Sequence, residues 1–520
     1  MKIFLTIVLG GLYTLCFAPF HYFALGFISF TGLLMILDTL QTGKKQFWYG
    51  FLFAFVHHVT GLYWISYSML VEPDKFAWMI PFSVSVIPAY LALYTGLVCW
   101  ITYRLKLRRI TKVLFFAGLW ALAEMARSYL FTGFPWNLTG YVFISKIALA
   151  QAASVIGSHG LTIFAIFIFC SPYLSIRYIK KNESLASVYR YSLSLYYLMP
   201  AIFLLTYLSA WGVDRIRENS HRFDKTKIRI VQPNIPQKEK FDPLRVADHL
   251  FKYYNLTLQE SEQEDFVPDL IIWPEAAVEL DIQNDSEFLT EVAEVIPFSS
   301  YLILGAVRRE GWMINQKVYN SIQVINSEGN LERSYYDKFH LVPFGEYVPL
   351  RSYLPFVEKL AKGIGDFDRG TGPKTLKLAN SPSFSPLICY EVIFPGNVKN
   401  IYDTEKPEWI LNLTNDAWFG NSSGPYQHLD SVRMRAIEEG LPVIRSANTG
   451  VSAVIDSVGE ILDLIKLNKD GIIDTKLPSR SIKETYYSVH GDELPLLLAG
   501  ILIILSMTLR YLSRFLSRAR

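Results

Sequence analysis

Long apolar runs occupy both ends of this 520-residue chain and constrain its fold more than any other feature. A helix that crosses a bilayer needs roughly 20 mostly apolar residues. Seven such runs precede residue 213, and an eighth lies near the C-terminus. The sequence therefore predicts a multi-span α-helical membrane domain with eight transmembrane helices. Their approximate ranges are 3–20, 22–40, 47–69, 76–103, 110–131, 150–178, 193–212 and 494–512.

Between these runs the composition is that of a water-soluble domain. We expect a seven-helix transmembrane domain over 1–212, a soluble domain over 213–492, and a C-terminal transmembrane helix with a basic tail over 493–520. The first run is expected to stay as an anchor, because no small-residue cleavage site follows it and another apolar run begins at once. The basic tail is interpreted as membrane-flanking, and no nucleic-acid partner is expected.

Lysine and arginine collect in every second gap between the predicted spans. Because these residues mark cytoplasmic loops, both termini are predicted to be cytoplasmic. The soluble domain then faces outward, which in a bacterium is the periplasmic side of the inner membrane. The residues that carry this prediction are Lys44, Lys45, Arg104, Lys106, Arg108, Arg109, Lys112, Arg177, Lys180, Lys181, Arg190, Arg510, Arg514, Arg518 and Arg520.

Short apolar runs alternate with helical stretches in the soluble part. This alternation predicts an α/β layered domain. Strands are predicted at 227–234, 269–275, 301–309, 383–391 and 409–416, and a pair of strands, "PVIRSANTG" and "SAVIDSVGEIL", lies over 442–462. A hairpin is predicted at 319–338, with its turn at 328–330. Helices are predicted at 243–265, at 286–296, after Pro395 and at 425–439.

Cysteine usage singles out one position. Cys16, Cys99 and Cys170 fall inside apolar runs, whereas Cys389 stands alone in the predicted exported domain. Cysteines in exported domains are normally paired, so a lone one is either a reactive thiol or a buried, inert side chain. Both interpretations stay open at this point.

Two further polar residues follow apolar or aromatic runs in the way that Cys389 does. Glu275 ends "LIIWPE", and Lys338 lies in "YYDKFHLVPFGEYVP". A thiol attacks as the thiolate, so it needs a base, and a carboxylate in a poorly solvated pocket can accept the proton. An ammonium nearby stabilises the thiolate and the oxyanion formed by its attack on a carbonyl. The three residues therefore form a candidate nucleophile set.

The motifs around these residues resemble the nitrilase superfamily, and within it the bacterial apolipoprotein N-acyltransferases, over the whole chain. The resemblance implies an αββα sandwich as the fold of the soluble domain. The motifs are "GFPWN" at 133–137, "VQPNIPQKEKF" at 231–241, "WPEAA" at 273–277, "DKFHLVPFGEYVP" at 337–349, "ICYEVIFP" at 388–395, "LTNDAWFG" at 413–420 and "RSANTGVSAVID" at 445–456.

The resemblance also implies roles for residues. Glu275 would be the general base, Lys338 the stabiliser of oxyanion and thiolate, and Cys389 the nucleophile. Supporting residues would be Glu346, Tyr390 and Glu391. Phe241 stands where family members often have Trp, on a loop thought to contact lipid. A lid, or otherwise mostly ordinary core or interfacial-belt packing, is expected of the aromatic residues Phe339, Phe344, Tyr347, Tyr353, Phe356 and Phe367, near Gly363 and Gly365.

The reaction implied is ping-pong acyl transfer, and no cofactor is expected. The nine histidines show no metal-ligand spacing, so no metal site is expected either. A phospholipid, usually phosphatidylethanolamine, would acylate Cys389, and the N-terminal amine of a diacylglyceryl-apolipoprotein would take the chain. A membrane-tethered amidase of the same superfamily and a transporter with an exported sensing domain are the alternatives.

Outside this site, Glu124 and Arg127 are expected to pair on one helix face, and His340 is expected to have a packing role. His57 and His58 have no assigned role.

Overall fold

The computed structural model describes residues 1–181, 187–240, 242–278, 281–311, 316–355, 357–361, 365–400 and 402–518. Two compact units are interleaved along the chain. The helical unit comprises Met1–Tyr63, Ile80–Glu218 and Thr485–Arg520, and the sheet unit comprises Trp64–Met79 and Asn219–Glu484. The domain boundaries proposed at residues 212 and 492 remain predictions, because compactness does not show which part lies in a membrane.

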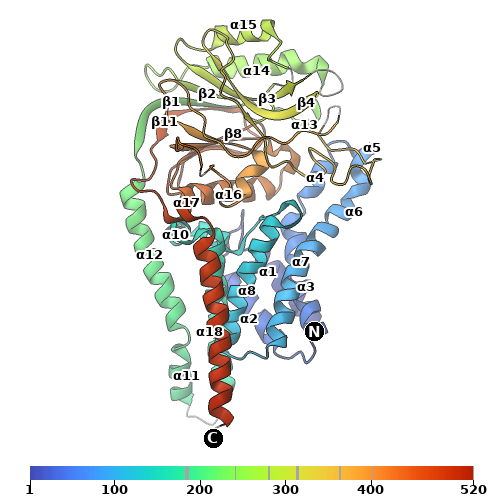
Figure 1. The fold of residues 1–520 in the computed structure, drawn as a ribbon, viewed down its shortest axis with the longest axis vertical. Coiled ribbons are helices and arrows are strands. Elements are labelled where there is room, and N and C mark those ends of the chain that lie inside the picture. The colour runs from blue at the N-terminus through green and yellow to red at the C-terminus, as the bar shows by residue number, and fades with distance from the viewer. Residues whose placement is uncertain are drawn as a thin grey trace. The chain divides into compact units, whose positions relative to one another are not determined.

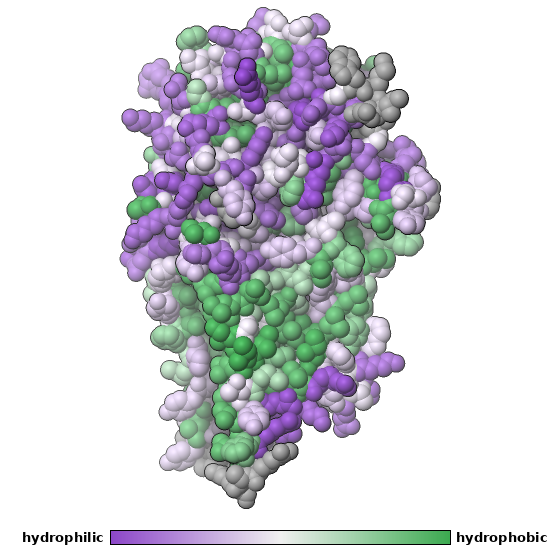
Figure 2. All heavy atoms as spheres, viewed as in Figure 1, coloured by the Kyte–Doolittle hydropathy of each residue, from purple (hydrophilic) through white to green (hydrophobic). Residues whose placement is uncertain are grey.

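Apolar helices make up the helical unit, and Figure 2 shows hydrophobic side chains gathered over its visible face. The helices are α1 (Lys2–Thr14), α2 (Leu25–Leu37), α3 (Gly43–Leu62), α6 (Ile80–Ser83), α7 (Val86–Arg104), α8 (Ile110–Tyr129), α9 (Ile147–Ala150), α10 (Ala153–Lys181), α11 (Ser187–Leu195), α12 (Met199–Asn219), α17 (Tyr486–His490) and α18 (Glu493–Arg518), with 3₁₀ turns η2 (Leu130–Thr132) and η3 (Thr139–Ser145).

Among the described residues, four helical stretches are long and apolar enough to cross a membrane: Pro73–Arg104, Ile110–Thr132, Ala153–Lys180 and Glu493–Leu516. The eight-span prediction is thus matched at four of its runs, while α1 and α2 are apolar but shorter. The run predicted at 47–69 is interrupted, because α3 ends at Leu62 and residues 64–79 belong to the sheet unit. Those residues form α4 (Ile65–Met69), α5 (Pro73–Phe76) and the 3₁₀ turn η1 (Ala77–Met79).

The expected pair between Glu124 and Arg127 is confirmed, with 3.3 Å between Arg127 Nη2 and Glu124 Oε1. Glu124 also accepts hydrogen bonds from the Thr139 backbone N–H and from the hydroxyls of Thr139 and Thr162. Buried charges persist where they are paired and hydrogen-bonded, and this pair is both. It therefore ties α8 to η3 and α10.

Two β-sheets face each other in the sheet unit (Figure 1). The first has the order β11-β1-β2-β3-β4-β5, with β1, β2 and β3 parallel; the second has the order β10-β9-β8-β7-β6, with β6, β7 and β8 parallel. The strands are β1 (Phe223–Gln232), β2 (Leu270–Ile272), β3 (Tyr301–Glu310), β4 (Lys317–Asn326), β5 (Tyr336–Asp337), β6 (Phe384–Ile388), β7 (Trp409–Thr414), β8 (Val443–Ala447), β9 (Ser452–Ile455), β10 (Ile461–Ile465) and β11 (Gly471–Pro478).

Helices α14 (Val246–Leu258) and α15 (Ser286–Val295) cover the outer face of the first sheet, and α16 (Gly424–Glu439) that of the second (Figure 1). Alternation along the strands explains the layers, since successive side chains point to opposite faces. Ile230 and Ile272 join the core between the sheets, whereas Val231 and Ile271 join the core under α14 and α15. The predicted α/β layered domain and its αββα order are confirmed.

Most predicted elements lie within a few residues of the observed ones, including the hairpin, whose strands β4 and β5 pair antiparallel. The helix predicted after Pro395 is wrong, because the described residues between 395 and 408 form turns and bends. The remaining short elements are α13 (Gln237–Lys240) and the 3₁₀ turns η4 (Pro243–Arg245), η6 (Cys389–Ile393) and η7 (Asp416–Phe419).

Candidate active site

Glu275 lies just beyond the end of β2, where the chain leaves the sheet sharply. Pro274 precedes it, and Ala276 has a φ of 47°, in the left-handed region, so the strand does not continue. A β-carbon on Gly305 of β3 would lie 2.7 Å from Glu275 Cα. Only glycine permits this close approach, which brings the buried Glu275 side chain to the edge of the sheet.

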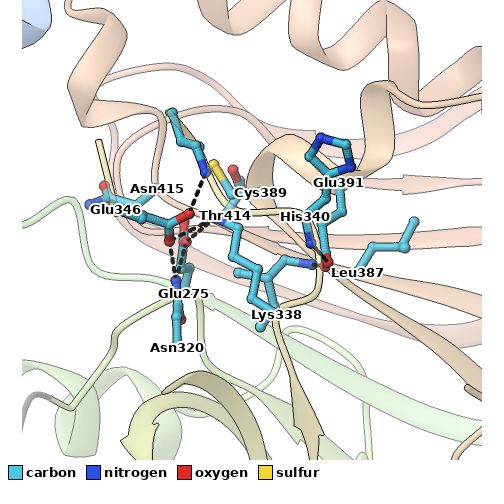
Figure 3. A network of polar contacts seen from close by, with 12 residues as sticks. Glu275, Asn320, Lys338, His340, Glu346, Leu387, Cys389, Glu391, Thr414 and Asn415 are labelled. Carbon is cyan, nitrogen blue, oxygen red and sulfur yellow. Dashed lines mark hydrogen bonds and ion pairs between the residues drawn. The ribbon is translucent and has the colours of Figure 1, made fainter. Parts of the chain in front are cut away.

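Lys338 follows β5 directly and is buried between two carboxylates. Its Nζ lies 3.0 Å from Glu346 Oε1 and 3.4 Å from Glu275 Oε1. Asn320 of β4 donates from Nδ2 to the same two oxygens, at 2.9 Å to Glu275 and 3.0 Å to Glu346 (Figure 3). Residues from four segments of the chain thus meet at one buried point.

Cys389 follows β6 and opens the 3₁₀ turn η6. Its φ of 51° lies in the left-handed region, which residues with a β-carbon rarely adopt. Figure 3 shows its sulfur on the side of the turn where Glu275 and Lys338 also lie. Such a sharp strand-to-turn junction is one way in which a fold exposes a nucleophile to a cleft.

The charges around Cys389 act on its pKa in opposite directions. Burial raises the pKa of the Cys389 thiol, and the Glu275 carboxylate raises it further, whereas the Lys338 ammonium lowers it. Burial alone would lower the pKa of Lys338, but Glu346 and Glu275 outweigh burial and raise that pKa above its usual value. Lys338 therefore stays protonated, and the thiol stays neutral near pH 7 until a base accepts its proton.

Glu391 is hydrogen-bonded through both carboxylate oxygens. Its Oε1 accepts from Tyr336 Oη at 2.8 Å, from Phe339 N at 2.7 Å and from His340 N at 3.0 Å. Its Oε2 accepts from Ile388 N at 2.7 Å. These bonds tie the turn after Cys389 to the loop that carries Lys338, so the geometry gives Glu391 a positioning role.

The Glu275 carboxylate accepts fewer hydrogen bonds than the Glu391 carboxylate does. In the part of the chain that the structure describes, Asn320 and Lys338 both donate to its Oε1, and its Oε2 has no hydrogen-bond partner. Glu346 is intermediate, since its Oε2 accepts from Val342 N at 2.9 Å. Of these three carboxylates, Glu275 has the oxygen that is free to accept a proton.

The other predicted site residues lie around this centre. Tyr390 is buried, with its ring edge-on to Phe394 at 5.1 Å. The expected packing role of His340 is confirmed, because its ring stacks on Phe394 at 3.8 Å.

The predicted lid aromatics are a mixed set. Phe344 and Tyr353 are exposed, while the Phe339 and Phe367 rings lie under the cations Arg369 and Lys359 at 3.8 Å and 4.2 Å. Tyr347 is half-buried, and its backbone oxygen accepts from Phe344 N. A lid role for these residues remains a prediction. Phe241, Phe356 and Gly363 lie outside the described residues.

Four further residues at the site were not selected from the sequence, although two of them, Lys240 and Thr414, lie within the motifs at 231–241 and 413–420. Asn320 bridges the carboxylates, and Lys240 Nζ donates to the Glu275 backbone oxygen at 3.1 Å. A hydrogen bond from Thr414 lowers the pKa of Cys389, although burial outweighs it. His428 Nε2 donates to the Cys389 backbone oxygen at 3.2 Å. Only the tertiary fold brings these residues to the site.

Comparison with known proteins agrees with this geometry. Residues 227–487 match the carbon-nitrogen hydrolase family, which covers the sandwich and all three predicted catalytic residues. Residues 9–171 match the apolipoprotein N-acyltransferase N-terminal domain. Both family models thus match this one chain, the apolipoprotein N-acyltransferase N-terminal domain first and the carbon-nitrogen hydrolase domain second.

Three curated relatives, each named "Apolipoprotein N-acyltransferase", match over almost the whole chain. The Rhodopseudomonas palustris protein is 38% identical, covering 97% of this chain and 94% of its own length. The Bradyrhizobium diazoefficiens protein is 38% identical, covering 98% and 95%. The Rickettsia prowazekii protein is 35% identical, covering 96% of each. The chain belongs to the apolipoprotein N-acyltransferase family. It is thus an acyltransferase, and the resemblance read from its motifs is confirmed.

Proposed function

We propose that this chain N-acylates the diacylglyceryl-cysteine at the N-terminus of apolipoproteins, with a membrane phospholipid as acyl donor and Cys389 as the covalent carrier. The observation that supports it is the convergence of Cys389, Lys338 and Glu275 at three strand ends of the sandwich. A thioester carrier divides the transfer between two bulky lipid substrates into two simpler displacements.

In the first half-reaction, Glu275 Oε2 accepts the Cys389 thiol proton, and the thiolate attacks the carbonyl carbon of an acyl ester. Lys338 stabilises the oxyanion that forms. The C–O bond then breaks, the leaving alkoxide takes the proton back from Glu275, and a lysophospholipid departs. A thioester on Cys389 remains. Phosphatidylethanolamine is the proposed donor.

In the second half-reaction, the α-amine of the acceptor attacks the thioester carbonyl. An α-amine has a pKa of about 7.7–8.0, so an appreciable share is neutral near pH 7. Glu275 accepts a proton from the amine, the C–S bond breaks, and the thiolate recovers that proton. The product is an amide-linked third acyl chain, and the thiol is regenerated for the next cycle.

The proposed placement is the inner membrane, with eight spans, both termini cytoplasmic and residues 213–492 periplasmic. Helices α1 and α2 have 13 residues each. At 1.5 Å per residue such a helix is about 20 Å long, so both need flanking residues to cross a core of about 30 Å.

The orientation can be tested by labelling. In bacteria with a permeabilised outer membrane, an impermeant maleimide should label Glu328→Cys above the parent background. It should not label Lys44→Cys, and the reverse pattern would refute this orientation.

The decisive test uses purified protein with a phospholipid labelled in its acyl chain and a synthetic diacylated lipopeptide. Mass spectrometry should find the acyl group on Cys389 before lipopeptide is added, and in amide linkage afterwards. Cys389→Ser should lower transfer at least about 1,000-fold while the protein stays folded. Release of free fatty acid without amide product would instead favour the membrane-tethered hydrolase.

A further inference from the structure

The left-handed backbone at Cys389 needs support from its surroundings, because such conformations persist only where neighbouring structure holds them. One support reaches it through the main chain. His428 Nε2, on α16, donates to the Cys389 backbone oxygen at 3.2 Å. The contact fixes the peptide group that follows the Cys389 side chain, and it therefore bears on where the sulfur points.

His428 is itself held from its other ring nitrogen. Its Nδ1 lies 2.9 Å from Asp416 Oδ1, and Arg445 Nη2 lies 2.5 Å from Asp416 Oδ2. Thr414 Oγ1 also lies 3.1 Å from Asp416 Oδ1. The side chains of His428, Asp416 and Arg445 are fully buried, so the imidazole has little freedom to turn.

A second set of contacts reaches His428 from a distant part of the sequence. Trp64 Nε1 donates to Gln427 Oε1 at 3.1 Å, and the Trp64 ring is edge-on to Phe419 at 4.4 Å. Phe419 in turn is edge-on to His428 at 5.8 Å. A β-carbon on Gly424, in the first turn of α16, would lie 3.0 Å from the Trp64 ring, so the packing leaves no room for a side chain there.

Trp64 begins the 64–79 segment, which belongs to the sheet unit although helical-unit segments flank it in sequence. Ser68, further along this segment, donates from its hydroxyl to the Trp418 backbone oxygen at 3.0 Å. The family model for the N-terminal domain spans residues 9–171 and so includes the segment. A part of the N-terminal half of the chain is thus built into the sandwich next to the helix that carries His428.

We propose that His428 is a positioning residue that holds Cys389 through its main-chain oxygen, and that Trp64 steadies His428 through Gln427 and Phe419. The proposal rests on the nucleophilic role of Cys389 proposed above. Without His428, the turn relaxes and the sulfur moves away from the Lys338 ammonium. The thiolate fraction and the rate of acyl transfer then fall together, while acceptor binding is unchanged.

The test uses the full-length protein in lipid nanodiscs, with the variants His428→Ala, His428→Gln and Trp64→Phe. His249→Ala, in α14, and Trp48→Phe, in α3, are matched controls. Two quantities are measured: the rate at which iodoacetamide alkylates Cys389, followed by peptide mass spectrometry, and kcat and KM for transfer to a lipopeptide.

His428→Ala should lower both the alkylation rate and kcat by about 10- to 100-fold, the scale expected for a displaced reacting group, with KM within about twofold of the parent. The amide of His428→Gln can donate to the same oxygen. Its alkylation rate and kcat should therefore lie about midway, on a logarithmic scale, between those of His428→Ala and those of the parent. Trp64→Phe keeps an aromatic ring but removes the indole N–H and makes the side chain smaller, so a loss of about three- to tenfold is expected. The two controls should match the parent.

Unchanged alkylation and kcat in His428→Ala would overturn the proposal, as would a change in KM alone. If His428→Ala does not fold by circular dichroism, His428→Gln and Trp64→Phe decide, and parental values in both would overturn it. Alkylation requires no acyl donor. A parent protein that forms no thioester would therefore refute the proposed function separately, while the alkylation rates still test the positioning role.

Discussion

Glu275, after β2, and Glu391, in the turn after β6, are the same residue type at nearly the same burial, with exposed fractions of 7% and 4%. They differ in what surrounds their oxygens. Glu391 has four donors spread over both oxygens, whereas Glu275 has two donors on a single oxygen. A carboxylate whose two oxygens both accept hydrogen bonds holds the surrounding backbone in place. A carboxylate with one oxygen free of donors can accept and release a proton. Burial alone does not tell these roles apart.

The donors differ in kind as well as in number. Three of those on Glu391 are backbone N–H groups, which stay fixed as long as the fold does. Those on Glu275 are the side chains of Asn320 and Lys338, which Glu346 shares. Glu275 and Glu346 thus share the same two side-chain donors and differ in their second oxygens, since Glu346 Oε2 accepts from Val342 N. The open oxygen of Glu275 is the reason why we propose Glu275, and not Glu346, as the base.

The largest expected effect comes from Glu275→Gln, which keeps the shape and removes the base. Loss of a general base typically lowers a rate by about 10²- to 10⁴-fold, and we expect kcat for transfer to fall in that range. Because the Glu275 carboxylate raises the pKa of Cys389, iodoacetamide alkylation at fixed pH should rise in this variant rather than fall. Loss of both activities, or of neither, would contradict the assignment of Glu275 as the base.

The second prediction concerns the rate at which iodoacetamide alkylates Cys389 as the pH changes. We expect this rate to rise about 100-fold from pH 6 to pH 8. Burial and Glu275 raise the pKa of the thiol, so below that pKa each pH unit gives about ten times more thiolate. A plateau below pH 8 would show a thiol that is already ionised and would contradict the need for a base.

Lys338→Met should lower the rate of Cys389 alkylation at every pH, because the ammonium that lowers the thiol pKa is removed.

Much of this site follows from local sequence. A Pro after an apolar run predicts that a strand ends near Glu275, and an isolated Cys after β6 stands out by composition alone. Glu275 and Lys338 follow strands of the first sheet, whereas Cys389 follows a strand of the second. The meeting of all three was therefore expected from the family motifs and not from the strand ends alone.

The rest depends on tertiary contacts that no local pattern encodes. Asn320 and His428 lie in the interiors of a strand and a helix, where an Asn or a His is usually structural. Strand β11 was missed because "GIIDTKLP" lacks clear alternation, and its pairing with β1 spans more than 230 residues of sequence. The run at 47–69 reads as continuous by hydropathy, yet packing against the sandwich removes its end from the helical unit.

The smallest expected effect, and the one that completes the comparison, comes from Glu391→Gln. An amide has one accepting oxygen and one donating NH₂, so at least one of the four donors around position 391 meets another donor. A lost hydrogen bond to a charged group lowers the free energy of unfolding by roughly 1.5–3 kcal/mol, which corresponds to several degrees in Tm. We expect Glu391→Gln to melt that much lower and to lose about tenfold in transfer through displacement of the Cys389 turn. Glu275→Gln keeps an acceptor oxygen for Asn320 and Lys338 and leaves Glu346 beside Lys338, so it should melt closer to the parent than Glu391→Gln does. Equal melting temperatures for the two variants would mean that donor count does not separate a positioning carboxylate from a reactive one.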